Sequence, residues 1–163
     1  MAKNKEEKTN VMRTLEQKKI AYTAKTYPHG EGDAIDGVSV AKAMGLDVEM
    51  VFKTLVCKGV SGGYYVFDIP VAENLDLKKA AKAVGEKSVA MLPQKELLPL
   101  TGYVHGGCSP VGMKKQFPTV FHKTAESLSQ VAVSAGKIGY QVVCDPKDLM
   151  GLLRAGTADI IVE

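Results

Sequence analysis

Apolar and polar residues follow one another along this 163-residue chain in short blocks, some with helical spacing and others with strand spacing. Apolar residues three and four positions apart predict four short helices. These helices are expected at residues 9–19, 38–44, 76–84 and from 145 onward. Thr9 and Asp76 stand where side-chain oxygens cap helix N-termini, and Gly45 and Gly85 stand where glycines end helices. Asp145-Pro146 begins the last helix, because proline suits the first helical turn.

The strands are predicted by runs of β-branched and aromatic residues. Phe52–Lys58 and Tyr64–Ile69 flank a glycine-containing segment, 59–63, so this part of the chain predicts a β-hairpin. Further strands are expected at residues 21–27, 88–91, 119–122, 131–134, 140–144 and 159–162. Helices and strands follow one another without regular β-α alternation, which favours a mixed, largely antiparallel α+β fold over a doubly wound sheet. The length, with no internal repeat, predicts a single domain covering residues 1–163.

Composition narrows the class of protein. With 45% hydrophobic and 24% charged residues, the chain resembles an ordinary globular protein. No apolar run reaches the roughly 18 residues of a membrane span, and the polar N-terminus lacks the apolar core of a signal peptide. Cys57, Cys108 and Cys144 are widely spaced, so free thiols and a cytoplasmic location are expected.

The net charge of +3 comes almost entirely from lysine, since Arg13 and Arg154 are the only arginines. Two lysine groups could follow a nucleic-acid backbone, although solvated helix faces would have the same pattern. The groups are Lys78, Lys79, Lys82 and Lys87, and Lys114 with Lys115.

A glycine-rich loop is the strongest candidate for chemistry. Gly106-Gly107-Cys108-Ser109-Pro110 lies between Gly102 and Gly112. Adjacent glycines allow backbone N–H groups to form a nest for an anion or a developing oxyanion, although a lone Gly-Gly pair is more often a tight turn. A second glycine loop, Ser134–Gly139, adds a hydroxyl and Lys137, but its spacing is not that of a phosphate-binding P-loop.

Lys53 is the second candidate. It lies in a predicted strand whose two faces are both mostly apolar, so its ammonium must either reach water at the strand end or meet an anion.

No protein nucleophile is evident. His105 and Cys108 could form a dyad, but local spacing says little about such pairs. The histidines lack zinc-site spacing, so neither metal nor cofactor is expected. Backbone donors without a nucleophile suit a substrate that is already reactive and needs only alignment and charge stabilisation.

Five blocks of sequence, taken together, resemble a known family. They are Thr26-Tyr27-x-His29, Val51–Leu55, Leu75–Gly85, Gly102–Gly112 and Val133–Gly139. In this order they are similar to the YbaK/EbsC family of free-standing aminoacyl-tRNA deacylases, which is related to the editing domain inserted in bacterial prolyl-tRNA synthetase. The resemblance extends over nearly the whole chain and implies a barrel-like mixed sheet surrounded by helices.

The resemblance also implies an activity and a site. The implied activity is the hydrolytic editing of mischarged tRNA, typically Cys-tRNA(Pro), without cofactor or metal. Lys53 corresponds to the family's functional lysine, which holds the terminal adenosine or its phosphate, and Gly106, Gly107 and Ser109 correspond to the loop that faces the aminoacyl carbonyl. The implied substrate-binding residues are Tyr27, His29, Thr54, Ser134, Gly136, Lys137 and Gln141.

In the chemistry implied by this family, the thiol of the substrate's own cysteine attacks the ester carbonyl and departs as a thiolactone. Gln141 stands where some members have aspartate, and Asp36 where some have an aromatic residue; both bear on amino-acid selectivity. Sister groups remove alanine from the proline tRNA. The implied partners are aminoacyl-tRNA and, as a candidate, prolyl-tRNA synthetase.

Two functions of other classes stay open from the sequence. The same pocket could serve a non-catalytic aminoacyl or nucleotide-binding module. A general RNA-binding protein is the weaker alternative, because the chain has few arginines and only 6% aromatic residues for base stacking.

Overall fold

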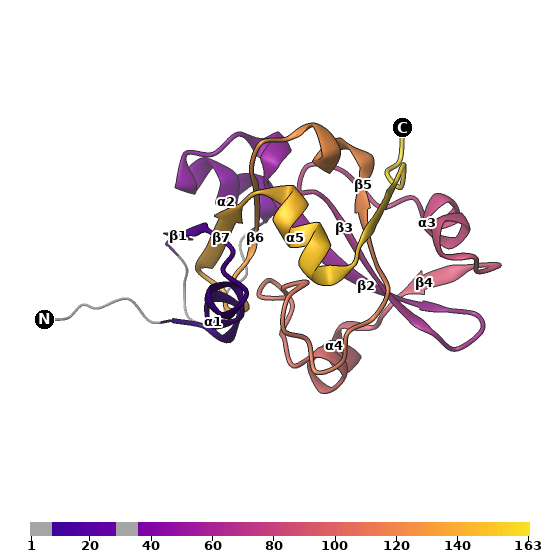
Figure 1. Cartoon of the computed structure of the whole chain (residues 1–163). Coiled ribbons are helices and arrows are strands. Elements are labelled where there is room, and N and C mark those ends of the chain that lie inside the picture. Colours follow the sequence, from indigo (N-terminus) through magenta and orange to yellow (C-terminus); the bar gives the residue numbers. More distant parts are fainter. Residues whose placement is uncertain (1–7, 29–35) are drawn as a thin grey trace, which may run out of the picture.

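The computed structural model describes residues 8–28 and 36–163, which form two β-sheets with helices around them (Figure 1). The strands are β1 (Tyr22–Thr26), β2 (Phe52–Gly59), β3 (Tyr64–Pro70), β4 (Val89–Met91), β5 (Thr119–His122), β6 (Val131–Ser134), β7 (Tyr140–Cys144) and β8 (Gly156–Ala158). The helices are α1 (Asn10–Gln17), α2 (Gly37–Met44), α3 (Leu77–Val84), α4 (Gln94–Thr101) and α5 (Pro146–Leu153), with short 3₁₀ turns η1 (Val48–Met50) and η2 (Lys123–Ser127).

The larger sheet has the strand order β4-β2-β3-β5-β8, and the smaller one has the order β1-β7-β6. β3–β5 and β5–β8 pair in parallel, whereas the other named strand pairs are antiparallel. A parallel bridge between Val51 and Ala132 joins the two sheets beside β2 and β6. The mixed, largely antiparallel α+β fold and the predicted β2–β3 hairpin are therefore confirmed.

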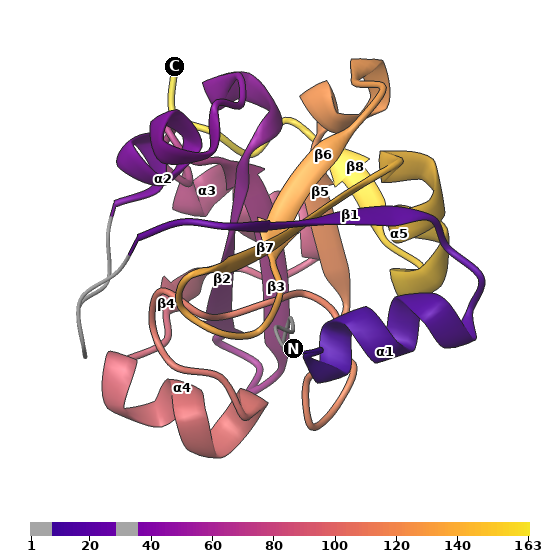
Figure 2. The ribbon, with the colours of Figure 1, turned by 90° about the vertical axis from the view of Figure 1, so that its left-hand side faces the viewer.

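The largest part of the core lies where α1 and α5 pack against the small sheet. Figure 2 shows these two helices on the same side of the molecule, with β1 crossing near the viewer. Val11 and Leu15 of α1 and Leu149 of α5 are fully buried in one cluster with Phe121 of β5. The small sheet is thereby held against the large one, and the two sheets together supply the walls of the site described below.

Most of the expected helix ends are confirmed. Thr9 accepts a hydrogen bond from the Met12 N–H at 3.2 Å, and the side chains of Asp76 and Asp145 cap α3 and α5 in the same way. Gly45 and Gly85 end their helices in the left-handed conformation, with φ of 70° and 76°.

Two elements differ from the prediction. Helix α4 was not predicted; its Pro99 has no N–H to donate within the helix, and the helix closes with the Gly102 N–H donating to Leu98 O at 2.8 Å. The last strand lies at Gly156–Ala158 and not at 159–162. The apolar run at 160–162 leaves the sheet because its backbone pairs with the segment before α3: Asp76 N–H donates to Ile160 O, and Val162 N–H donates to Asn74 O.

Within residues 8–28 and 36–163, no helix is both long and apolar enough to cross a bilayer.

Candidate functional site

A cavity of about 540 Å³ opens between the two sheets and the loop before Ser109. Its lining includes the start of β2, the end of β1, the N-terminus of α2, part of α4, and facing residues of β6 and β7. Six of the predicted site residues line it: Tyr27, Lys53, Thr54, Gly106, Ser134 and Gln141. These residues come from distant parts of the sequence, so the fold brings together most of the predicted pocket.

Lys53 is the half-buried cation of this cavity. Desolvation lowers the pKa of its ammonium, and the negative charge of Glu73 opposes that shift. Among the described residues, no carboxylate lies within ion-pair distance of Lys53. An anion entering the cavity therefore meets a lysine that is not already neutralised by a salt bridge.

Below Thr54 lies a buried carboxyl group that the sequence analysis missed. Asp68 is directly opposite Thr54 in the β2–β3 pair, and the Thr54 hydroxyl and Asp68 Oδ1 share a hydrogen bond of 2.5 Å. Asp68 has no solvent exposure, and burial raises its pKa to about 8 despite the hydrogen bond from Thr54, which lowers it. An aspartate inside the apolar run of β3 was the signal in the sequence that could have identified it.

Gln141 also carries an unpaired buried oxygen. It is 7% exposed, and its Oε1 has no hydrogen-bond partner among the described residues. On the neighbouring strand Ser134 lies opposite Gln141, and the Ser134 hydroxyl accepts a hydrogen bond from the Gly136 N–H at 3.0 Å. This wall of the cavity thus offers an acceptor to a ligand.

Only one of the three site residues predicted in the first glycine loop reaches the cavity. Gly106 lines the cavity and has a φ of 89°, a conformation that favours glycine. Gly107 and Ser109 are not among the lining residues. The Gly107 N–H already donates to Val104 O at 3.0 Å, and the fully buried Ser109 hydroxyl accepts from the Val111 N–H. In this loop the lining residues whose backbone N–H has no described acceptor are His105, Gly106 and Cys108.

The second glycine loop lines the cavity only at Ser134, and the rest of it packs behind the first loop. A Cβ at Gly107 would come within 3.1 Å of the Ile138 nitrogen, and a Cβ at Gly136 within 2.9 Å of the Tyr103 ring. Lys137 lies with its ammonium 5.1 Å from the centroid of the Tyr140 ring. Gly136 and Lys137 thus lie outside the lining, and the glycines allow two backbone segments to approach closely.

The remaining predictions have mixed outcomes. His29 lies outside the described residues. Cys57, Cys108 and Cys144 are free and buried, and burial raises the pKa of each thiol to about 12. His105 lines the cavity near Cys108, but the described hydrogen bonds include none between them. Among the described histidines, cysteines and carboxylates, no cluster of three could hold a metal ion.

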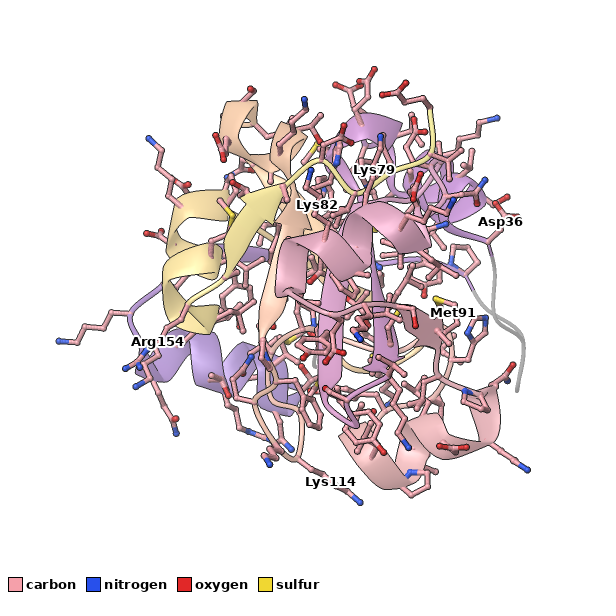
Figure 3. All side chains as sticks on the ribbon, turned by 90° about the vertical axis from the view of Figure 1, so that its right-hand side faces the viewer. Asp36, Lys79, Lys82, Met91, Lys114 and Arg154 are labelled. Atoms are coloured by element: carbon pink, nitrogen blue, oxygen red, sulfur yellow. The ribbon has the colours of Figure 1, made fainter. Side chains whose placement is uncertain are left out.

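The structure gives internal contacts to two of the charged residues considered in the sequence, Lys79 and Asp36. Lys79 of α3 is used within the chain, since its ammonium bridges Asp159 and Glu163. Figure 3 shows Lys79 and Lys82 on α3 and Lys114 at the lower end of the molecule, so the two lysine groups do not form one continuous patch. Asp36 caps α2 by accepting from the Ser39 N–H at 2.9 Å, and it also lines the cavity.

Replacing Asp68 by asparagine tests the burial of this carboxyl. The folded protein keeps the proton of Asp68 up to about pH 8, whereas the unfolded chain loses it near pH 4. The unfolded state therefore binds fewer protons between these values, and stability falls as the pH rises. We expect the free energy of unfolding of the wild type, relative to Asp68→Asn, to fall by up to about 1.4 kcal/mol per pH unit between pH 5 and 8.

Urea unfolding of both proteins at several pH values measures this difference, and the other titrating groups cancel because both proteins share them. A difference that does not change with pH would show that Asp68 is ionised in the folded state.

Three comparisons place this chain among known proteins. The aminoacyl-tRNA editing domain family matches residues 33–152. A protein of Enterococcus faecalis, provisionally named Cys-tRNA(Pro)/Cys-tRNA(Cys) deacylase EbsC, is 45% identical over 161 residues, covering 98% of each chain. A proline–tRNA ligase of Shouchella clausii is 29% identical over 103 residues, which are 63% of this chain and 18% of the ligase.

Solved structures agree with the sequence comparisons. A crystal structure provisionally described as a trans-editing enzyme for prolyl tRNA synthetase superposes with a TM-score of 0.80 at 25% identity, covering 94% of both chains. Hypothetical protein APE2540 shares the fold, with a TM-score of 0.83 at 21% identity over 93% of this chain and 99% of that one. The chain belongs to the aminoacyl-tRNA editing domain family.

Proposed function

We propose that this protein removes the amino acid from mischarged tRNA by cleaving the aminoacyl ester, with Cys-tRNA(Pro) as the preferred substrate. The observation that carries the proposal is the cavity itself, in which a half-buried lysine lies among backbone and side-chain donors and forms no salt bridge with any residue in 8–28 or 36–163. The 45% identical relative is named for the same activity, and the family match covers most of the chain.

In this proposal the substrate supplies the nucleophile. The thiolate of the bound cysteine attacks the ester carbonyl carbon, and the carbonyl oxygen becomes an oxyanion. The carbon–oxygen ester bond then breaks, the ribose oxygen takes up a proton, and the amino acid leaves as a cyclic thiolactone. The protein thiols are poor candidates for this attack, because a pKa of about 12 keeps them protonated at neutral pH.

Each part of the cavity has a proposed role in that reaction. Lys53 holds the terminal adenosine or its phosphate, because a desolvated ammonium with no carboxylate partner in the part of the chain that the structure describes favours an incoming anion. The Gly106 N–H faces the developing oxyanion, while Gly107 and Ser109 keep the loop in place. Gln141 Oε1 accepts from the ammonium of the amino acid. Tyr27, Thr54 and Ser134 complete the walls, and His29 is a further proposed contact of the substrate. Gly136 and Lys137, which lie outside the lining, support the loop behind the cavity.

Selectivity for another amino acid is the second candidate, and Gln141 is the observation that favours it. A neutral amide holds an ammonium less strongly than a carboxylate would, so the amino acid is selected more by the shape of the cavity. An alanine ester lacks a thiol, and its cleavage would need a water molecule as the nucleophile. The proline tRNA charged with cysteine, alanine or serine distinguishes these functions by the rate of ester loss, and binding without ester loss would indicate a binding module.

Replacing Lys53 by alanine should lower kcat/KM for Cys-tRNA(Pro) on the order of 100-fold, since the cavity loses its buried cation. The measurement is ester loss from labelled Cys-tRNA(Pro) under single-turnover conditions. Lys58→Ala is the matched control, because Lys58 lies on the same strand but is exposed and outside the cavity lining. Equal activity of the two variants would contradict the role of Lys53.

Replacing Cys108 by alanine should leave deacylation within a few-fold of the wild type, because its protonated thiol takes no part in the attack. Ester loss and thermal unfolding are measured on the same preparation. If the folded variant is inactive, or if mass spectrometry finds an aminoacyl adduct on the wild-type chain, the protein thiol is the nucleophile.

A further inference from the structure

The buried carboxyl of Asp68 has no role in the reaction described so far, although it touches the wall of the cavity. We propose that Asp68 is a positioning residue that, in its neutral form, donates its proton to Thr54 and so turns the Thr54 hydroxyl into a hydrogen-bond donor toward the substrate. The effect of Asp68 on the substrate rests on the proposed deacylase function, but the position of the proton between Asp68 and Thr54 does not.

The Asp68 carboxyl is isolated from solvent and, apart from Thr54, from hydrogen-bond partners among the described residues. It has no solvent exposure, and its Oδ2 is buried with no hydrogen-bond partner among the described residues. An ionised carboxylate in such a place would lose its hydration without a compensating donor or cation, which is very costly. A neutral carboxylic acid leaves only a weakly polar carbonyl oxygen at Oδ2, at a much smaller cost.

The described residues that surround Asp68 on the neighbouring elements are uncharged. Thr54 lies opposite on β2, Phe121 lies beside it on β5, and Cys108 is close enough for the charge of Asp68 to affect its thiol. Burial raises the pKa of Asp68 to about 8, the hydrogen bond with Thr54 opposes this shift, and no charged group among the described residues contributes to it. The surroundings of Asp68 thus favour its neutral form at physiological pH.

The hydrogen bond between Asp68 and Thr54 has a defined donor when Asp68 is neutral. The Thr54 hydroxyl is the single hydrogen-bond partner of the Asp68 carboxyl group among the described residues, at 2.5 Å from Oδ1. A neutral Asp68 satisfies its own O–H only by placing the proton on Oδ1 and donating it to Thr54. The Thr54 oxygen is then an acceptor on the Asp68 side, and its own hydrogen is free to turn into the cavity that Thr54 lines.

Proton donation by Asp68 determines on which side of the cavity hydrogen-bond donors and acceptors lie. Lys53 and Thr54, which are adjacent on β2, both offer donors, whereas Gln141 offers an acceptor from the small sheet. When Asp68 ionises, it accepts the Thr54 hydrogen, and only oxygen lone pairs remain toward the cavity. A carbonyl, ribose hydroxyl or phosphate oxygen beside Thr54 would then lose its donor, so Asp68 acts on the substrate through Thr54.

Infrared spectroscopy tests the position of the proton without any substrate. At pH 6 the difference spectrum between wild type and Asp68→Asn should contain the carbonyl band of a protonated carboxylic acid. This band should shift in Thr54→Val, which removes the partner of the proton. A spectrum without the band, or a band that does not respond to Thr54→Val, would overturn the proposed hydrogen bond.

Single-turnover deacylation tests the positioning role. Because the substrate is the same, its own ionisation cancels in the ratio of two enzymes. At pH 6.5 we expect Asp68→Asn to remain within about threefold of the wild type, since an amide also donates, and Asp68→Val to have a kcat lowered about tenfold with little change in KM. The ratio of wild type to Asp68→Asn should fall as the pH rises through about 8.

The double variant separates positioning from a structural effect. If Asp68 acts through Thr54, adding Asp68→Val to Thr54→Val should change kcat less than twofold. Thr119→Val is the control for the loss of a buried hydroxyl in the same sheet, since Thr119 is 4% exposed and bonded to Phe117 O away from the cavity lining. Additive losses in the double variant, or a ratio that is constant with pH, would overturn the role of Asp68. A wild type that cleaves none of the charged tRNAs would instead overturn the proposed function. The infrared spectra would in that case still test the hydrogen bond between Asp68 and Thr54.

Discussion

The antiparallel pairing of β2 with β3 is the interaction on which the site depends. It places Lys53 and Thr54 at the edge of the cavity and puts Asp68 directly beneath Thr54. Because side chains alternate across a strand, a shift of one residue in this register would exchange the two faces of β2 and separate Thr54 from Asp68. The hairpin turn after Gly59 and the neighbouring strands β4 and β5 hold that register from both sides.

Close packing of the two glycine loops is the second constraint. Gly107 lies against the backbone of Ile138, and Gly136 lies against Tyr103, whose hydroxyl donates to Val111 O at 2.5 Å. Tyr103 therefore connects the loop that reaches the cavity with the loop behind it. The glycines that resemble a phosphate or oxyanion nest in the sequence are used here mainly for the approach of backbone to backbone, and Gly106 alone of the Gly106–Gly107 pair borders the cavity.

The electrostatics of the cavity combine a cation with neutral polar groups. Burial lowers the pKa of Lys53, raises that of Asp68 and keeps the cysteine thiols protonated. Each of these shifts has the same cause, since a poorly hydrated site disfavours charge. Such a site can align an activated ester and stabilise the charge that develops on it, while the attacking group comes from the bound substrate or from water.

The sequence by itself determined the family and most of the local elements, with α4 and the last strand as the exceptions. Thr9, Asp76 and Asp145 identify helix starts because a capping side chain bonds to backbone only two or three residues away. It also indicated Lys53 as an unusual cation in an apolar strand.

Only the tertiary structure decided which residues reach the cavity, because that depends on contacts between segments far apart in the chain. Asp68 and Thr54 are 14 residues apart, and the pattern of β3 could not show that its single carboxyl lies under the cavity wall. The exit of residues 159–162 from the sheet was likewise set by hydrogen bonds to residues 74 and 76, which local propensity does not encode.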